Sequence, residues 1–449
     1  VSFLSKWVPG IPTSLLGCSS YFAWDDKTNS AIHGRVLDFP LQGSFDKNER
    51  AIWSKLDNGP ATLSFSSVGF PYPSITAMTE YGVSFALHQK FDDVFNTKGT
   101  PIFELIYNML QQCGDLASTL QYLKKNESLT TWAFYMGFKN GDVLACDVMG
   151  KQLAYKTYKV ESGKVLYFNN MLIDEARYKK QKDFLPYGIG QYNQMRLDIG
   201  NKKANKLSKQ KNLTCSKLIK EMATPMVQRT KNPAAWKCDP LTMSSIAVSV
   251  MNPSAAESYF IPGPAPKFYQ KELIKFSDCF NIPQQNIIYG TKSKIKQSKI
   301  NGYRDLMEAQ VSYDKGQYHE AYHFLQMAID QFEGLPEYYI AHFYFNVYQY
   351  IHDQHAKVRE KMLIEFKNLS GKLPEYLNDH CQLFIYRLDK IINGESQVTE
   401  DDIKTLSIKK ILNFERKMPN TLFHKATSVL TSPRIDTLDI IYAHVKMSD

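Results

Sequence analysis

The feature that most constrains the fold is a change of residue pattern near position 300. Up to about residue 290, short runs rich in β-branched and aromatic residues alternate with turn signals such as Asn140-Gly141, which is typical of strands joined by hairpins. Beyond residue 300 the strand patterns stop and apolar residues recur at helical spacing. The lysine-rich stretch 291–300 separates the two patterns. We therefore expect an α+β domain with antiparallel sheets at 18–290, a linker at 291–300 and a helical domain at 301–449.

The strand-like runs of the first domain are interrupted by two helical segments. Strands are expected at 20–24, 31–39, 61–68, 74–78, 83–88, 132–138, 141–149, 152–160, 164–169, 244–251 and 256–261. Helices are expected at 101–112 and 115–125, with Thr100 as the cap of the first and Pro101 in its first turn. The first two strands flank a polar turn, so we expect them to pair as a hairpin with Cys18 at its head.

The helical domain contains one helix–turn–helix pattern. The small residues Ala309, Ala321 and Ala328 lie where two antiparallel helices would cross closely, with Gly316 between them. This spacing resembles one tetratricopeptide repeat, but later segments do not repeat it and about three repeats are needed for a stable solenoid. We therefore expect a helical domain with a single hairpin of this kind, which offers a surface for a homo-oligomer contact or a protein partner.

Composition excludes several function classes. The chain has no run of 18 apolar residues, so no transmembrane segment is expected. Much of the formal charge of +9 comes from lysines at 202–211 and 292–299, which lack the interleaved aromatics of a nucleic-acid groove and are expected to be solvated loops. The seven cysteines form no CxxC pair, so neither a zinc site nor a redox motif is expected. Cysteines other than Cys18 are even in number, which favours export over the cytoplasm.

The segment Gly17-Cys18-Ser19-Ser20 carries the strongest chemical signal. If the chain is cut between Gly17 and Cys18, the cysteine gains a free α-amino group beside its thiol. An α-amine with a pKa of about 7.7–8.0 takes a proton readily at neutral pH, and a nearby cation favours the thiolate. One residue would then supply both nucleophile and base, as in enzymes with an N-terminal threonine. Residues 1–17 would be a propeptide or leader, and the uncut chain would be an inactive precursor.

Cys18 has two other interpretations. A lone cysteine in an apolar run is usually a buried small hydrophobe. The run Leu15-Leu16-Gly17-Cys18 also resembles a lipoprotein cleavage box, although the residues before it lack the continuous apolar core of a signal peptide.

Polar residues further along the chain complete a candidate site. Arg35 and Asp38 would return beside Cys18 if the second strand pairs with the first, where they would orient the amine and favour the thiolate. Their alternative interpretation is a simple ion pair. Asn169 and Asn170 end an apolar strand, and an amide donor aimed at an oxyanion contributes roughly 10²–10³ in rate. An asparagine pair at a strand end is otherwise a turn.

These residues resemble the N-terminal-nucleophile hydrolases that cleave linear amide bonds. That superfamily includes choloylglycine hydrolase, penicillin V acylase, acid ceramidase and the acyl-CoA:isopenicillin N acyltransferase family. The resemblance covers about 18–285 and rests on Cys18-Ser19-Ser20, Gly34-Arg35-Val36-Leu37-Asp38, the strand 79–86, Phe168-Asn169, the strand 242–250 and Gly263-Pro264. It implies an αββα sandwich of antiparallel sheets. It also implies a site of Cys18, Arg35 and Asp38 with Asn169 as oxyanion donor and Asn170 as second choice.

The sequence departs from this pattern at three points. Choloylglycine hydrolases have a second oxyanion asparagine at a place where this chain has His88 and Gln89. Gln89 can donate a hydrogen bond as asparagine does. His88 can replace the asparagine or can be a histidine of the core, and the sequence favours neither interpretation. A late arginine of the family has two counterparts, Arg177 and Arg196, which the sequence does not separate. The helical C-terminal domain is no part of the family pattern.

The resemblance implies a cysteine amidohydrolase that cleaves a linear, non-peptide N-acyl amide after autoproteolysis at Gly17-Cys18. The thiolate would form a thioester that water hydrolyses, with no metal or organic cofactor, and the substrate would be a small molecule. Two alternatives stay open: an acyl-CoA-dependent N-acyltransferase on the same fold, and a non-catalytic binding or scaffold protein that uses the C-terminal helices.

Overall fold

The computed structural model describes residues 17–38, 43–73, 75–90, 92, 94–176, 187–225, 239–291, 295–353, 355–430 and 435. The chain divides into two compact units. The first contains every strand described below, and the second contains the helices from Ile295 onward. Each unit is described by itself.

The first unit is built on two seven-stranded sheets in which all paired neighbours are antiparallel. The first sheet has the order β10-β1-β2-β11-β12-β13-β14, with β1 (Cys18–Asp25), β2 (Ser30–Asp38), β10 (Leu166–Phe168), β11 (Ser245–Asn252), β12 (Glu257–Phe260), β13 (Glu272–Ser277) and β14 (Gln284–Tyr289). The second sheet runs in sequence order, with β3 (Glu49–Ser54), β4 (Thr62–Ser67), β5 (Thr76–Thr79), β6 (Val83–Gln89), β7 (Thr131–Phe138), β8 (Asp142–Met149) and β9 (Gln152–Lys159).

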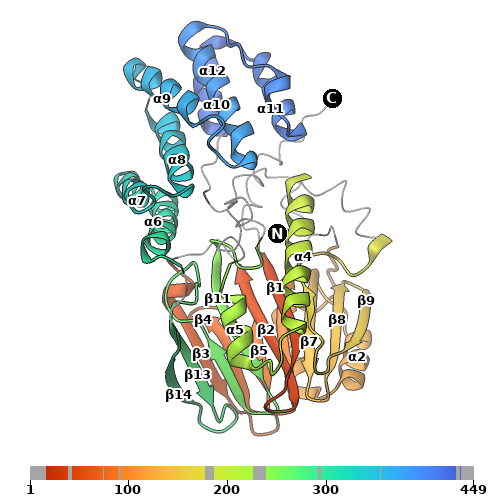
Figure 1. Cartoon of the computed structure of the whole chain (residues 1–449). Coiled ribbons are helices and arrows are strands. Elements are labelled where there is room, and N and C mark those ends of the chain that lie inside the picture. The colour runs from red at the N-terminus through yellow and green to blue at the C-terminus, as the bar shows by residue number, and fades with distance from the viewer. Residues whose placement is uncertain are drawn as a thin grey trace. The chain divides into compact units, whose positions relative to one another are not determined.

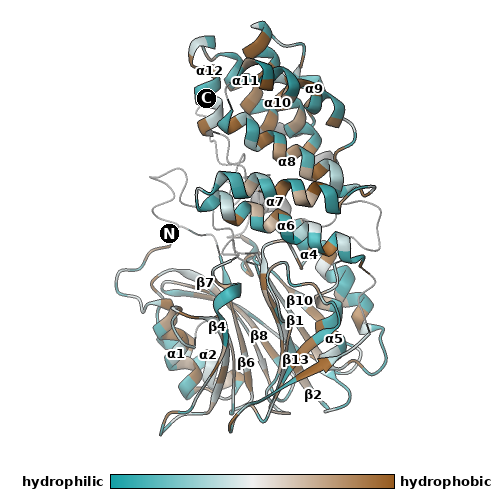
Figure 2. Cartoon of the chain, turned by 90° about the vertical axis from the view of Figure 1, so that its left-hand side faces the viewer, coloured by the Kyte–Doolittle hydropathy of each residue, from teal (hydrophilic) through white to brown (hydrophobic). Residues whose placement is uncertain are grey.

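The two sheets face each other and helices cover their outer faces (Figures 1 and 2). Between the sheets, Phe22 and Ala31 of the first pack with Ala133 and Tyr135 of the second. The helices α1 (Ile102–Gln112) and α2 (Leu116–Lys125) pack on the second sheet, and α4 (Tyr187–Ser208) and α5 (Cys215–Met222) lie on the first. The predicted α+β fold with an αββα sandwich is confirmed.

Local sequence explains the hairpin of β1 and β2. The Asp25 side chain accepts hydrogen bonds from the backbone N–H groups of Lys27 (2.9 Å) and Thr28 (3.1 Å), and Asn29 adopts a left-handed φ of 51°. The resulting register places Arg35 directly opposite Ser20. Directly opposed residues share a face, and side chains alternate along a strand. Cys18, Ser20 and Arg35 therefore face the second sheet, whereas Ser19 faces the covering helices.

Each strand and helix predicted for the first domain is present, and its ends lie within two residues of the predicted ends. One predicted helix cap is wrong. The helix α1 is capped by Pro101 instead of Thr100. Five elements were not predicted: β3, β13, β14, α4 and α5.

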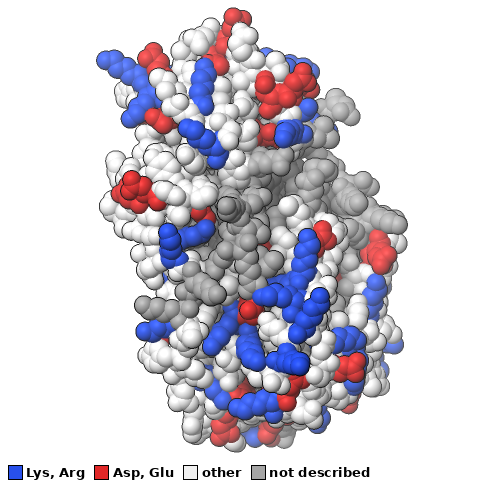
Figure 3. Space-filling view, in the orientation of Figure 1, with Lys and Arg blue, Asp and Glu red and all other residues white. Residues whose placement is uncertain are grey.

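The prediction that lysines 202–211 form a solvated loop is wrong for Lys202, Lys203 and Lys206, which belong to α4. It is right for Lys209 and Lys211, which lie exposed in the turn after this helix. Lys203 faces inward, is 1% exposed, and donates to the carbonyl of Thr224 at 2.9 Å. The neighbouring lysines gather at the surface over α4 and α5 (Figure 3), where the exposed ones are Lys202, Lys206, Lys209, Lys211 and Lys217.

The second unit is helical. Its helices are α6 (Gln297–Asp314), α7 (Tyr318–Gln331), α8 (Glu337–His352), α9 (Ala356–Leu369), α10 (Glu375–Asn393), α11 (Leu406–Arg416) and α12 (Asn420–Leu430). α6 and α7 form a hairpin in which Gly302 lies against the ring of Phe332, at a place where a Cβ atom would come within 2.5 Å of that ring. Among the described residues, no helix has the length and apolar character needed to cross a membrane.

Candidate active site

Cys18 begins β1 and lies buried beneath a guanidinium group. Its side chain is 1% exposed, and Arg35 Nη2 donates to Cys18 Sγ at 3.0 Å. The same Nη2 donates to the carbonyl oxygen of Leu87 in the second sheet at 2.7 Å. Arg35 is itself 1% exposed. The sulfur therefore has a buried cation as its hydrogen-bond partner.

The backbone nitrogen of Cys18 is held by a different group. It donates to Asn170 Oδ1 at 2.7 Å. The same oxygen accepts a hydrogen bond from Arg196 Nη1 at 3.2 Å, and Asn170 Nδ2 donates to the carbonyl of Gln89 at 2.9 Å. The nitrogen and the sulfur of one cysteine are thus each fixed by a buried polar side chain, Asn170 for the nitrogen and Arg35 for the sulfur.

Asp38 closes the cluster on the side of α4. Its Oδ2 pairs with Arg196 Nη2 at 3.0 Å, and Ser245 donates its hydroxyl proton to Oδ1. Burial raises the pKa of Asp38 to about 6, against the opposing effect of Arg196 and the Ser245 hydrogen bond. The backbone N–H of Asp38 donates to the carbonyl oxygen of Gly17 at 2.7 Å. The ion pair of Asp38 is therefore with Arg196, and Arg35 is left to the sulfur.

Some predicted site residues are not brought to Cys18. The side chain of Asn169 donates to the carbonyl of Asn193 in α4 at 2.7 Å and accepts from the N–H of Met171 in its own turn at 3.0 Å, so its amide is used away from Cys18. Gln89 contributes its backbone carbonyl, and its side chain lies on the face of β6 opposite to that of His88. Arg177 lies outside the described residues. Of the two arginine candidates, Arg196 is the one that the structure places beside Cys18.

A buried lysine missed by sequence reasoning supports the turn that carries Asn170. Lys90 Nζ lies 3.7 Å from Asp147 Oδ1 and donates to Tyr135 Oη at 3.1 Å and to the carbonyl of Met171. The carbonyl of Asn169 also accepts from Tyr135 Oη, at 3.0 Å. Burial lowers the pKa of Lys90, with Asp147 acting in the opposite direction. Nothing in the sequence marks this pair, because Lys90 follows β6, Asp147 lies on β8, and β7 separates these two strands in the sheet.

Two buried histidines flank Ser20. His33 Nε2 lies 3.0 Å and His88 Nε2 lies 2.9 Å from Ser20 Oγ. Burial, with Arg35 as the second cause, lowers the pKa of both imidazoles well below 6.5. Both rings are therefore neutral in the folded protein, whereas in the unfolded chain they take up a proton below about pH 6.5.

This difference predicts how a histidine variant changes the pH dependence of stability. Below about pH 6.5 the unfolded state binds one more proton at His33 than the folded state, so the stability due to this residue is lost as pH falls, at about 1.4 kcal/mol per pH unit. His33→Gln removes this loss. Below about pH 6.5, we therefore expect each further drop of one pH unit to lower the unfolding free energy of the wild type by about 1.4 kcal/mol more than that of His33→Gln. Urea unfolding at several pH values measures it, and parallel pH dependences in the two proteins would contradict the assignment.

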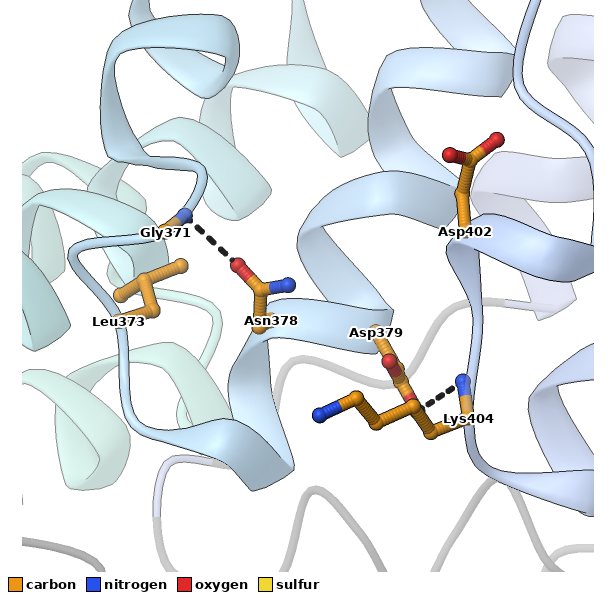
Figure 4. Close-up of a pocket in the computed structure, with 6 residues that line it drawn as sticks. All are labelled: Gly371, Leu373, Asn378, Asp379, Asp402 and Lys404. Atoms are coloured by element: carbon orange, nitrogen blue, oxygen red, sulfur yellow. Dashed lines mark hydrogen bonds between the residues drawn. The ribbon is translucent and has the colours of Figure 1, made fainter.

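Two cavities of the described chain are lined by residues other than those of this cluster. Figure 4 shows one in the second unit, with a volume of about 340 Å³. Its polar groups serve the chain itself: Asn378 Oδ1 accepts from the N–H of Gly371 at 2.8 Å, and Asp379 Oδ2 accepts from the N–H of Lys404 at 3.1 Å. Among the described residues, no group of three or more His, Cys, Asp or Glu side chains is placed to hold a metal ion.

The solved structures that align with part of this chain include two amide-cleaving enzymes. No protein-family model matches the chain, and no curated protein matches it in sequence. An N-acylethanolamine-hydrolyzing acid amidase ortholog from Caenorhabditis elegans aligns with a TM-score of 0.36 and 13% identity over 53% of this chain and 93% of its own. Penicillin V acylase from Agrobacterium tumefaciens aligns with a TM-score of 0.37 and 10% identity over 61% of this chain and 99% of its own.

Proposed function

We propose that the first unit is a cysteine amidohydrolase that cleaves a linear N-acyl amide, with Cys18 as an N-terminal nucleophile. The observation that supports it most is the pair of contacts at Cys18: Arg35 Nη2 at 3.0 Å from the sulfur and Asn170 Oδ1 at 2.7 Å from the nitrogen. A cysteine that served only to fill the core would need an acceptor for its buried backbone N–H, but no guanidinium at its sulfur. An enzyme whose nucleophile and base belong to one residue needs both atoms held in place.

The other described cysteines lack such a setting. Burial raises the pKa of the thiol in each of them, to about 11 in Cys113 and to about 12 in Cys279 and Cys381, with upward shifts also in Cys146 and Cys215. They are inert by the criterion that reactivity follows thiolate character. Cys18 is the described cysteine that has a guanidinium as donor to its sulfur.

The first chemical step unmasks the amine. The sulfur of Cys18 attacks the carbonyl carbon of Gly17, whose oxygen already accepts the N–H of Asp38 at 2.7 Å, a donor suited to the developing negative charge. The carbon–nitrogen bond breaks, and the nitrogen leaves as the amine with the thiol proton. Water then hydrolyses the resulting thioester, which releases the carboxylate of Gly17 and regenerates the thiol.

The same groups then act on substrate. Arg35 stabilises the thiolate, and the α-amine, held by Asn170 Oδ1, accepts the thiol proton. The sulfur attacks the amide carbon, and the oxyanion is met by the N–H of the Asn170 side chain that is not bonded to Gln89. The α-ammonium protonates the leaving amine, and water hydrolyses the thioester. Arg196 holds Asn170 Oδ1 in both steps and is itself paired with Asp38.

The surroundings of the sulfur favour an apolar acyl group. Cys18 packs in a cluster of buried apolar side chains that consists of Leu37, Phe45, Ile75, Ile246, Ala247 and Ala265, with Phe70 beside it. A charged or strongly polar acyl chain would lose its hydration there without replacement partners. We therefore place aliphatic or aromatic N-acyl amides first among the substrates.

Intact-mass measurement and a small substrate panel test the proposal. The mature protein should lack the residues before Cys18. It should also release amine from at least one of bile-acid, phenoxyacetyl, fatty-acyl or N-acyl homoserine lactone amides. A chain that keeps its residues before Cys18, leaves Cys18 unreactive toward iodoacetamide and turns over no member of the panel would refute it.

Gly17→Ala is expected to slow the unmasking step. A Cβ atom at this buried position would lie 2.6 Å from Asp38 Oδ2 and 3.2 Å from Arg196 Nη1, so the peptide and the ion pair must shift apart. A displacement of about 1 Å at a reacting group costs up to about 10²-fold in rate. A mass-spectrometric time course after synthesis measures the loss.

Gly137→Ala is the matched control for this variant. Its Cβ would lie 2.9 Å from Ser84 Oγ and 3.0 Å from the Phe22 ring, which is a similar clash at another place between the sheets. Equal processing rates in the two variants would show that the contact of Gly17 with Asp38 is immaterial.

A further inference from the structure

His88 reaches Arg35 from the second sheet. It lies on β6, is fully buried, and its Nε2 is 2.7 Å from Arg35 Nη1 and 2.9 Å from Ser20 Oγ. A guanidinium has no acceptor atom, so Arg35 donates and His88 Nε2 accepts. The imidazole proton is then on Nδ1 and the ring is neutral. Burial and the charges of Arg35 and Lys90 lower the pKa of His88 well below 6.5, which agrees with a neutral ring.

Arg35 has an unusual set of partners for a buried cation. In the described part of the chain, no carboxylate oxygen lies within the 4.0 Å of an ion pair with Arg35, and Asp38 pairs with Arg196 instead. Arg35 donates to a neutral imidazole, to the carbonyl of Leu87 and to Cys18 Sγ. Of these three acceptors, only the sulfur gains a full negative charge during catalysis.

We propose that His88 is a positioning residue that orients Arg35 without neutralising it, so that the guanidinium charge is kept for the Cys18 thiolate. A carboxylate is the usual partner of a buried arginine and would orient it equally well through paired hydrogen bonds. It would also compete with the thiolate for the same charge, because an opposite charge within about 4–6 Å shifts an ionisation equilibrium by about 1–3 pH units. A neutral acceptor gives the orientation without the competition. This inference rests on the proposed role of Cys18 as nucleophile.

The charged groups around His88 determine what a carboxylate at position 88 would do. The titratable groups that act on His88 are Arg35, Lys90, His33 and Arg196, so its charged neighbours are cations and His33 is neutral. A glutamate introduced there would be ionised and would pair with Arg35. A glutamine would keep a neutral acceptor oxygen at nearly the same reach.

The experiment compares His88→Gln with His88→Glu. Full-length protein, matured as it is produced, is labelled with iodoacetamide across a pH series, and the Cys18 peptide is quantified by mass spectrometry. We expect His88→Gln to label within about tenfold of the wild-type rate at neutral pH. We expect His88→Glu to label at least about tenfold more slowly there, with its pH midpoint raised by about one unit or more. His33→Gln, which loses a buried imidazole without touching Arg35, is the control and should keep the wild-type midpoint.

Three outcomes decide the matter. Equal labelling profiles of His88→Gln and His88→Glu would overturn the inference, since charge at position 88 would then be irrelevant. If the ordering holds but no amide is turned over, the role of His88 stands and the proposed function fails. If thermal melts show that His88→Glu is unfolded, the comparison is made instead in protein that carries Arg35→Met, with and without His88→Gln. A residue that acts through Arg35 has no effect once Arg35 is gone, so His88→Gln should then change the labelling rate less than about twofold; a larger loss refutes the inference.

Discussion

Replacing Cys18 with alanine is expected to abolish amide hydrolysis and to leave the residues before position 18 attached. Both outcomes have one cause, because the sulfur that forms the substrate thioester is also the group that attacks the carbonyl of Gly17. Removal of a covalent nucleophile reduces kcat by roughly 10⁴- to 10⁶-fold. Release of amine from the best substrate of the panel and the intact mass of the purified chain measure the two effects.

Two further variants make this test specific. Cys113→Ala removes another buried thiol, whose pKa burial raises to about 11, and should mature and turn over substrate as the wild type does. Cys18→Ser replaces the sulfur that accepts from Arg35 with the less nucleophilic hydroxyl oxygen, and should mature slowly if at all. A Cys18→Ala protein with wild-type turnover would place the active site elsewhere.

The sequence predicts the hairpin of β1 and β2, which carries Cys18 and Arg35, because its two strands are close together along the chain. Cys18 and Arg35 lie on adjacent strands joined by a short polar turn, so strand alternation and turn chemistry decide which side chains meet. The partner of Asp38 is different. Arg196 approaches from α4, about 160 residues along the chain, and no local pattern couples it to β2.

The helix α4 was missed for a physical reason. Its sequence contains Gly200 and a run of lysines, and glycine in a helix interior costs about 1 kcal/mol relative to alanine. The structure explains the glycine: a Cβ at this position would lie 2.0 Å from the Tyr167 ring of β10. A residue that weakens the helix locally therefore allows the close approach that brings Arg196 to Asn170. Local propensity and tertiary packing disagree at this point, and packing decides the outcome.

The sequence also does not determine which of Asn169 and Asn170 faces Cys18. The structure identifies Asn170, and its replacement is the second variant with a large expected effect. The two residues follow a strand of only three residues, so a shift by one position exchanges which side chain faces Cys18. In the structure Asn170 holds the Cys18 nitrogen at 2.7 Å, and Asn169 is occupied with Asn193 and Met171. We expect Asn170→Ala to lower kcat by about 10²–10³-fold, the usual loss of an oxyanion donor.

Asn169→Ala is the matched control at the neighbouring position. It removes one hydrogen bond to α4 and one within the turn, and should cost about 1 kcal/mol of stability, with a change in kcat below about tenfold. Asn170→Asp separates the two roles of Asn170: an aspartate keeps an acceptor for the Cys18 nitrogen but has no amide N–H for the oxyanion. It should therefore retain maturation better than Asn170→Ala while losing turnover to a similar extent. If Asn169→Ala lost more turnover than Asn170→Ala, the oxyanion donor would be Asn169, and the turn would have to rearrange when substrate binds.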